Sequence, residues 1–447
     1  MFNSSHDRSS FTDTIKTGGL ANEISTYRQS NSSGLTSNHD TYRLSNSSDY
    51  QGLHSNDLQP SIGTHKRPGQ DQSLAAYTKN FTNKGVNYGD NFYESKENGS
   101  GSNSSSSGFV YVQTNAADGN QIVVYRRADD GKLSYLEKVS TGGRGSGGGL
   151  DPLQSESSLI LSEDQRFLFA VNSASGTITS FATTPKGLVR VDQESTDGAF
   201  PTSIAVHGDL LYTLNASGNR NITGFHILPN GHLQHLDNST RGVDGNAFDV
   251  GASTIGFSPD GKFIVVSERL ANQFDVYKVK PDGTTDQPVI SPSVGKNPFG
   301  LYFTPQGTLL SAEANPEATV SSYSINSDGS LNPISRSVPN LASGSCWIVT
   351  TGDGHIAISS NTPSDSVSSF LISPSGELNY ASTTSLESGA RSLDIATTHN
   401  SPYLYTLNAA AGSVSAFKVE DNGQINLIDT ISEGLQANSG LQGISAV

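Results

Sequence analysis

The sequence predicts an all-β protein, a seven-bladed β-propeller closed by its C-terminal strand and preceded by a disordered N-terminal tail. Three observations predict it: an aromatic–glycine repeat that recurs seven times, a second hairpin in front of most copies, and a first unit that lacks one strand. Only 15% of the 447 residues are charged, while 46 are glycine. This composition favours short strands and tight turns over helices.

Residues 1–108 are predicted to be a disordered, low-complexity tail. Segments such as NSSDYQ and ENGSGSNSSSSG consist mainly of small and polar residues. They contain too little apolar surface to offset the entropy lost on ordering. The simple interpretation is a flexible extension, and the alternative is an arm that docks a protein partner. The propeller itself is predicted to span residues 109–447.

The repeat has a short β-rich run that ends in an aromatic residue, followed five positions later by a residue that precedes glycine. The aromatic ring suits packing between neighbouring sheets, and the glycine supplies the positive φ of a tight hairpin. The seven copies are Tyr125 with Asp130-Gly131, Phe181 with Lys186-Gly187, Phe225 with Asn230-Gly231, Tyr277 with Asp282-Gly283, Tyr323 with Asp328-Gly329, Phe370 with Ser375-Gly376, and Phe417 with Asn422-Gly423.

A second hairpin of apolar strands, such as SSLILS and RFLFAVNS, precedes the aromatic run in the later units. Each complete unit therefore contains four antiparallel strands, A to D, in about 40–50 residues, which is typical of a propeller blade. The predicted A-to-B turns are Glu163-Asp164, Gly208-Asp209, Asp260-Gly261, Gln306-Gly307, Asp353-Gly354 and the stretch 399–402.

The first unit begins at FVYVQTN, a B strand with no A strand before it, and the chain ends with LQGISAV, which has the pattern of a lone A strand. The last strand is therefore predicted to complete the first blade. Ring closure of this kind leaves no unpaired interior edge.

The net charge is −15, and nearly all of it belongs to residues 109–447, because the tail is almost neutral. An acidic domain repels nucleic acid and anionic membranes, so we expect neither as a partner. The single cysteine, Cys346, excludes an intrachain disulfide and a cysteine-based zinc site, and we expect no metal or cofactor. Without an apolar N-terminal leader or membrane span, we expect a cytoplasmic protein. We also expect a monomer.

Candidate chemistry is predicted at the mouth, the face that carries the D-to-A and B-to-C connections around the channel. Two carboxylates, Glu313 and Glu268, follow B strands there and are the candidate catalytic bases. The alternative is that they belong to a ring of ion pairs and asparagines that satisfies the strand ends.

Five further residues at the mouth are candidates for substrate binding. An arginine can bind a carboxylate or phosphate with two hydrogen bonds, and an amide can orient the same ligand. The candidates are Arg269, Arg391, Arg144, Gln154 and Asn297.

We expect no role at the site for four of the histidines or for Cys346 and Trp347. His207, His226, His232 and His235 are predicted at turns and edges away from the mouth. Cys346 and Trp347 begin an inner strand and are predicted to be core residues.

The segments SLILSEDQRFLFAVNSASGTITSF, STIGFSPDGKFIVVSERLANQFDVYKV and PYLYTLNAAAGSVSAFKVEDNGQINLI resemble the seven-bladed lactonase family, which includes propeller-type 6-phosphogluconolactonase and fungal carboxymuconate cyclase. The resemblance covers about residues 109–447. It implies lactone hydrolysis, or the reverse ring closure, on an anionic sugar acid or muconate. It also implies a site built from a histidine, arginines and a glutamate. Glu313 matches the glutamate, whereas Ser253 and Asn297 stand where the histidine and an arginine are expected.

We therefore expect a lactonase-like hydrolase acting on a small anionic sugar lactone such as 6-phosphogluconolactone. The alternative is a non-catalytic propeller that binds a ligand or a protein, with the tail as a tether. A metal-dependent lactonase is a third hypothesis.

Overall fold

The computed structural model describes residues 108–243 and 251–447. The predicted disordered tail therefore lies outside the described residues, except for its last one. Gly108 is the first residue of a strand, β1 (Gly108–Gln113).

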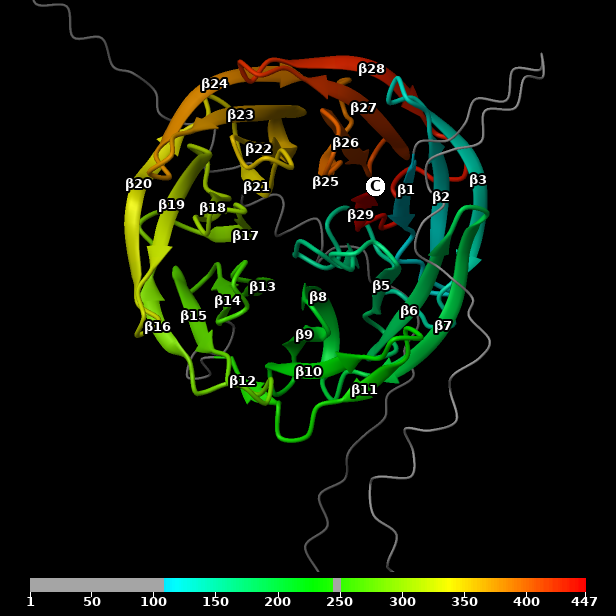
Figure 1. Ribbon diagram of the computed structural model, residues 1–447. Coiled ribbons are helices and arrows are strands. Elements are labelled where there is room, and N and C mark those ends of the chain that lie inside the picture. Colours follow the sequence, from blue (N-terminus) through cyan, green and yellow to red (C-terminus); the bar gives the residue numbers. More distant parts are fainter. Residues whose placement is uncertain (1–107, 244–250) are drawn as a thin grey trace, which may run out of the picture. The chain divides into compact units, whose positions relative to one another are not determined.

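Seven antiparallel sheets stand in a ring around a central axis, which confirms the predicted propeller (Figure 1). Strands A and B form the inner half of each sheet. From the first sheet to the seventh, the A strands are β29 (Ile444–Ala446), β4 (Leu159–Leu161), β8 (Ala199–His207), β13 (Ala252–Phe257), β17 (Pro298–Phe303), β21 (Ser345–Thr350) and β25 (Ser392–Thr397). The B strands are β1, β5 (Phe167–Asn172), β9 (Leu210–Ser217), β14 (Phe263–Glu268), β18 (Leu309–Glu313), β22 (Ile356–Asn361) and β26 (Tyr403–Asn408).

Strands C and D form the outer half. The C strands are β2 (Gln121–Arg127), β6 (Thr177–Thr184), β10 (Asn221–Ile227), β15 (Gln273–Lys278), β19 (Thr319–Ile325), β23 (Ser366–Ile372) and β27 (Ser413–Val419). The D strands are β3 (Leu133–Ser140), β7 (Gly187–Ser195), β11 (Leu233–His235) with β12 (Arg241–Gly242), β16 (Val289–Pro292), β20 (Leu331–Pro339), β24 (Leu378–Ser385) and β28 (Ile425–Ile431). A single 3-10 turn, η1 (Thr362–Ser364), completes the elements of the described residues.

The C-terminal strand closes the ring as predicted. β29 pairs antiparallel with β1, so that Ile444 lies opposite Val112. Beyond the strand, the amide of Val447 donates to the carbonyl of Phe109 at 2.9 Å. The first and last parts of the described chain therefore build one sheet.

The repeat residues occupy the places that the sequence predicted. The seven aromatic side chains at the ends of the C strands are at most 1% exposed. The seven glycines of the C-to-D turns have φ between +82° and +130°, a region that residues with a Cβ rarely adopt. One residue type therefore fills the space between sheets, and the other turns the chain.

Hydroxyl groups join neighbouring sheets through these same turn glycines. In three places a serine that directly precedes the aromatic donates to the turn carbonyl of the next sheet. Where Gly224 and Ala416 replace that serine, a tyrosine opposite them on the B strand makes the bond instead. The bonds are Ser180 to Gly231, Ser322 to Gly376, Ser369 to Gly423, Tyr212 to Gly283 and Tyr405 to Gly131.

Candidate functional site

The loop between β3 and β4 crosses the axis of the ring, and its residues 150–158 form what we call the axial plug. Three bonds centre on Ser155. Its hydroxyl donates to the carbonyl of Thr202 at 2.8 Å, and its carbonyl accepts from the Trp347 indole at 3.0 Å and the Gln442 amide at 2.8 Å. The plug is thus tied to the third and sixth sheets and to the segment before β29. The sequence placed this loop at the mouth but did not indicate that it enters the channel.

Glu156 carries the plug across the axis. One carboxyl oxygen accepts from the amide of Leu301 at 3.0 Å, and the other from the amide of Ile348 at 2.8 Å. These amides belong to β17 and β21, the inner strands on the opposite side. Burial raises the pKa of Glu156, and the nearby Asp394 raises it further, whereas the two amides act in the other direction. Sequence analysis did not single out Glu156, because the residues next to it in the sequence do not indicate contacts with distant strands.

A polar cluster lies at the start of the plug on the mouth side. The Asp151 carboxyl accepts from the Gln442 amide at 3.1 Å, and the Arg269 guanidinium donates to the side-chain oxygen of Gln154. Burial raises the pKa of Asp151 to about 6, with Arg269 and the bond from Gln442 opposing that rise. The structure therefore joins two predicted binding residues, Arg269 and Gln154, beside a carboxyl whose pKa is raised by burial.

Cys346 lies at the edge of this cluster. Its thiol donates to the carbonyl of Gly344 at 3.3 Å. Burial raises the thiol pKa, and Asp151 raises it further. The thiol therefore stays protonated at neutral pH and lacks the thiolate needed for nucleophilic attack. Trp347 is 1% exposed and belongs to the core, as expected.

Glu313 ends β18, is fully buried, and accepts hydrogen bonds from the hydroxyls of Thr319 and Ser321 on β19. In the sixth sheet Asn361 has the same place and donates to Ser366 and Ser368 at 3.2 and 2.9 Å. Glu313 thus occupies a strand-end position where other sheets carry an asparagine, with donor and acceptor exchanged.

Glu268 has the corresponding place at the end of β14 and is also fully buried. One of its oxygens accepts from the Gln273 amide at 2.6 Å. The catalytic role of the two glutamates remains a prediction, but the contacts show that both also join a B strand to its C strand.

The remaining predicted residues contact backbone near the mouth. Arg391 donates to the carbonyl of Pro363 at 3.1 Å, and Asn297 donates to the carbonyl of Ala314 at 2.6 Å. Both residues precede an A strand and have positive φ, 49° and 60° respectively. The side chain of Arg144 is exposed, while its backbone amide donates to the Ser175 hydroxyl oxygen at 2.8 Å. The binding roles of these three stay predictions.

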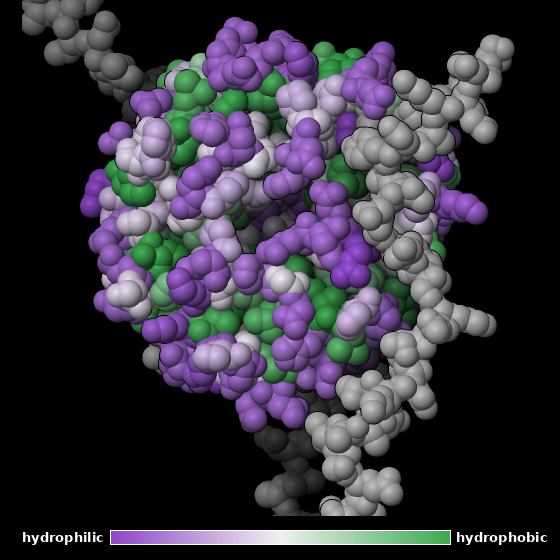
Figure 2. Space-filling model, in the orientation of Figure 1, coloured by the Kyte–Doolittle hydropathy of each residue, from purple (hydrophilic) through white to green (hydrophobic). Residues whose placement is uncertain are grey.

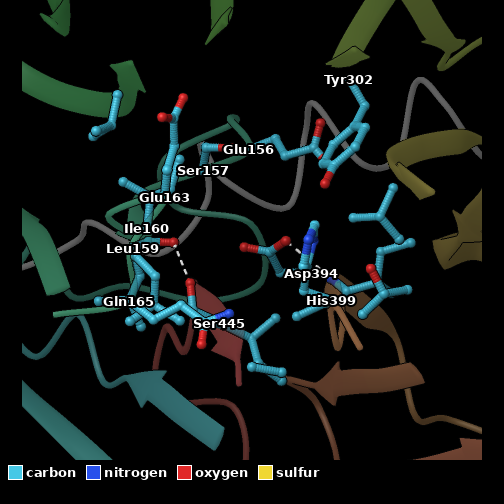
Figure 3. A pocket seen from close by; sticks show the side chains of 18 of the residues that line it. Glu156, Ser157, Leu159, Ile160, Glu163, Gln165, Tyr302, Asp394, His399 and Ser445 are labelled. Carbon is cyan, nitrogen blue, oxygen red and sulfur yellow. Dashed lines mark hydrogen bonds between the residues drawn. The ribbon is translucent and has the colours of Figure 1, made fainter. Parts of the chain in front are cut away.

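Two adjoining cavities, of about 350 and 290 Å³, lie inside the ring towards the back, the face that carries the A-to-B turns. Glu156 and Asp394 line the larger one, and Tyr302 and His399 line both. Figure 3 shows these four side chains around one space. In the orientation of Figure 1, hydrophilic side chains surround the hollow at the centre of the ring (Figure 2). The sequence analysis placed the ligand site at the mouth and did not single out this space.

No group of three or more histidine, cysteine, aspartate or glutamate side chains in residues 108–243 and 251–447 is placed to hold a metal ion. The predicted histidines do not all lie towards the back, because His235 contacts Asp197 of the β7–β8 connection at 3.3 Å. In contrast, His207 contacts Glu163 in an A-to-B turn at 3.0 Å. Within the same residues, no helix has the length and apolar character needed to cross a membrane.

The closed ring of seven antiparallel blades with a plugged channel defines the chain as a seven-bladed β-propeller. Residues 219–348 match the sequence model of the family described as "Lactonase, 7-bladed beta-propeller", which confirms the resemblance seen in the repeat segments. No curated protein matches the chain.

Solved structures share the fold at low sequence identity. A putative 6-phosphogluconolactonase from Bacteroides fragilis is 21% identical with a TM-score of 0.62, covering 78% of this chain and 99% of its own. One from Bacteroides uniformis is 20% identical with a TM-score of 0.61, covering 76% and 99%. A periplasmic gluconolactonase from Pseudomonas aeruginosa is 19% identical with a TM-score of 0.61, covering 75% and 98%.

Proposed function

We propose that this propeller is a lactonase-like hydrolase whose site lies at the mouth and takes a small anionic sugar lactone. The observation that carries the proposal is the position of Asp151 beside Arg269 and Gln154 at the start of the axial plug. A carboxyl with a pKa of about 6 next to a guanidinium supplies a base and an anion-binding group in one place. The family match and the names of the similar structures support the same class of reaction.

In this proposal the Asp151 carboxylate takes a proton from water as the water oxygen attacks the lactone carbonyl. The ring C–O bond then breaks, and the departing alkoxide receives the proton back from Asp151, which completes the hydrolysis to the open acid. A base is most effective when its pKa lies near the working pH, and the raised pKa of Asp151 meets that condition.

Arg269 would bind the anionic group of the substrate, with Gln154 turning from the guanidinium to the sugar. The domain is acidic overall, so an anion is attracted only by such a local positive charge. Similar structures bear the names of lactonases for phosphorylated and unphosphorylated gluconolactone, and we propose the phosphorylated substrate because Arg269 favours the greater charge.

The test is the rate of hydrolysis of 6-phosphogluconolactone and of glucono-δ-lactone above the spontaneous rate. Asp151→Asn should lower kcat by about 100-fold or more, the range that a general base contributes. Arg269→Gln should raise KM for the phosphorylated substrate and leave the neutral one little changed. Glu313→Gln is the comparison variant.

Three outcomes would decide between the bases. Loss in Asp151→Asn with activity kept in Glu313→Gln supports Asp151. The reverse assigns catalysis to Glu313, as the sequence predicted. A wild-type rate no faster than the spontaneous one contradicts lactonase activity on these substrates.

A non-catalytic binding propeller is the second candidate, and the hydrogen bonds that occupy the Glu313 carboxylate favour it. In that case the segment before β1 would act as a protein-docking arm. Deletion of residues 1–107 should then abolish partner recovery in a pull-down, while Asp151→Asn should not. The compartment and the monomeric state remain predictions.

A further inference from the structure

The cavities on the back side of the channel are a separate space with their own chemistry. Apolar side chains from several inner strands form the walls of the larger one, among them Ile160, Val206, Val349, Ile395 and Ile444. A volume of about 350 Å³ falls within the range of small-molecule sites. Such walls suit the apolar body of a small ligand.

The polar groups of this space are mainly acidic. Glu156 and Asp394 are each 3% exposed and line the larger cavity, and Glu163 lines both. No lysine or arginine is among the residues that line either cavity, and His399 is the one basic side chain there. Charge complementarity therefore favours a cation, because a buried carboxylate without a counter-charge is costly.

The axial plug separates this space from the mouth. Glu156 bonds to the amides of Leu301 and Ile348 on the far side of the channel, while Ser203 donates to the Glu156 carbonyl at 2.6 Å. The cavities share Glu163, Gly352 and His399 with the A-to-B turns. A ligand would therefore enter from the back, independently of any substrate at the mouth.

From the acidic inner end, the apolar walls and the plug, we infer that the back of the channel is a second binding site, specific for a small organic ammonium ion with an apolar body. The ammonium group lies against Asp394 and Glu156, and the body packs on the walls formed by Val206, Val349 and Ile395. The Tyr302 ring and His399 line the same space (Figure 3). The inference does not depend on the proposed lactonase activity.

Binding of this kind is coupled to protons. Burial raises the pKa of Asp394 well above its usual range and Asp151 raises it further, whereas hydrogen bonds from the backbone of Ile395, Ile444 and Gly443 act in the other direction. Glu156 behaves in the same way. Because the raised pKa values favour the protonated carboxyls, we expect an ammonium ion to bind more tightly as pH rises and its binding to release protons. The other titratable groups that line the cavities are Glu163, Tyr302 and His399.

The experiment is isothermal titration of the full chain with three probes of matched shape: benzylammonium, benzyl alcohol and benzoate. We expect benzylammonium to bind with Kd at or below about 1 mM and the two others to bind at least about tenfold more weakly. Heats measured in buffers of different ionisation enthalpy should show proton release. Equal affinity for benzyl alcohol, or no binding of benzylammonium at about 10 mM, would overturn the inference.

Variants locate the probe. Asp394→Asn should weaken benzylammonium binding at least about tenfold, and Val206→Phe, which fills the cavity, should weaken it similarly. Asp353→Asn, an exposed aspartate of the same face, is the matched control and should bind like the wild type. If Asp394→Asn fails to fold, Val206→Phe decides. Unchanged affinity in a folded cavity-filling variant contradicts the site.

Discussion

The hydroxyl of Tyr405 donates a hydrogen bond to the carbonyl oxygen of Gly131 at 2.9 Å. Tyr405 lies on β26 of the seventh blade, and Gly131 lies in the β2–β3 turn of the first. This bond therefore crosses the junction at which the ring closes, next to the blade that both ends of the described chain build. Tyr212 makes the equivalent bond to Gly283 between the third and fourth blades at 2.8 Å.

We expect Tyr405→Phe to lower the free energy of unfolding by about 1–2 kcal/mol. The ring stays packed, but the buried Gly131 carbonyl loses its donor. Chemical denaturation monitored by fluorescence measures the change. Tyr380→Phe, which removes a hydroxyl at an exposed position on β24, should cost less than about 0.5 kcal/mol. An equal decrease in the free energy of unfolding in both variants would show that the bond from Tyr405 to Gly131 adds no more stability than an exposed hydroxyl does.

Removal of residues 441–447 should destabilise the propeller far more than any single substitution. It deletes β29, exposes the inner edge of β1, and removes the bond from the Ser445 hydroxyl to the Leu159 carbonyl at 2.9 Å. An open edge invites pairing with other chains, so aggregation should accompany the loss. Differential scanning calorimetry and light scattering measure both effects. A truncated chain that unfolds at the wild-type temperature would contradict closure by β29.

Glu156→Leu should lower the free energy of unfolding by about 2–4 kcal/mol, because the buried amides of Leu301 and Ile348 both lose their acceptor. Denaturant titration measures the loss, with Glu387→Leu at an exposed site as the control. Increased hydrogen exchange at these two amides would identify the cause. Wild-type protection there would show that the plug does not depend on the carboxyl.

Asp151→Asn should stabilise the protein at neutral pH while it lowers hydrolysis. Burial raises the pKa of Asp151 from 3.8 to about 6, so the folded state binds the proton more tightly than the unfolded state. The wild type therefore loses stability as pH rises from about 4 to 6, and the loss persists above that range. The variant should gain about 1–3 kcal/mol at neutral pH and nothing near pH 4.

Unfolding free energies measured across this pH range test that expectation. A gain that is the same at every pH would show that titration of Asp151 is not its source. If Asp151→Asn is more stable but less active, Asp151 is a functional group that costs the protein stability.

Local patterns were sufficient to predict the blades. The aromatic residue and the glycine five positions later recur with fixed spacing, because each blade needs one ring to pack and one turn with positive φ. The missing A strand before Gly108 and the extra one at the C-terminus predicted the closure. Arg269 and Gln154 were both predicted at the mouth, because topology assigns loops to faces, and their side chains contact each other, but their role in binding stays a prediction.

The course of the axial plug was decided only in three dimensions. Glu156 lies 145 residues from Leu301 and 192 from Ile348 along the chain, and no local pattern links such distant partners. The back cavities could not be predicted either, because their walls come from separate blades that are far apart in the sequence. The bonds of Glu313 to Thr319 and Ser321 are nearer in sequence, but their geometry depends on how β18 and β19 pair.

The sequence by itself determined the repeated blade and the way the ring closes, because short-range periodicity and turn chemistry act within about 50 residues. Only the tertiary structure decided which carboxyls face each other inside the ring. Burial and electrostatic interaction depend on distances across the axis, and those exist only once all seven blades have assembled.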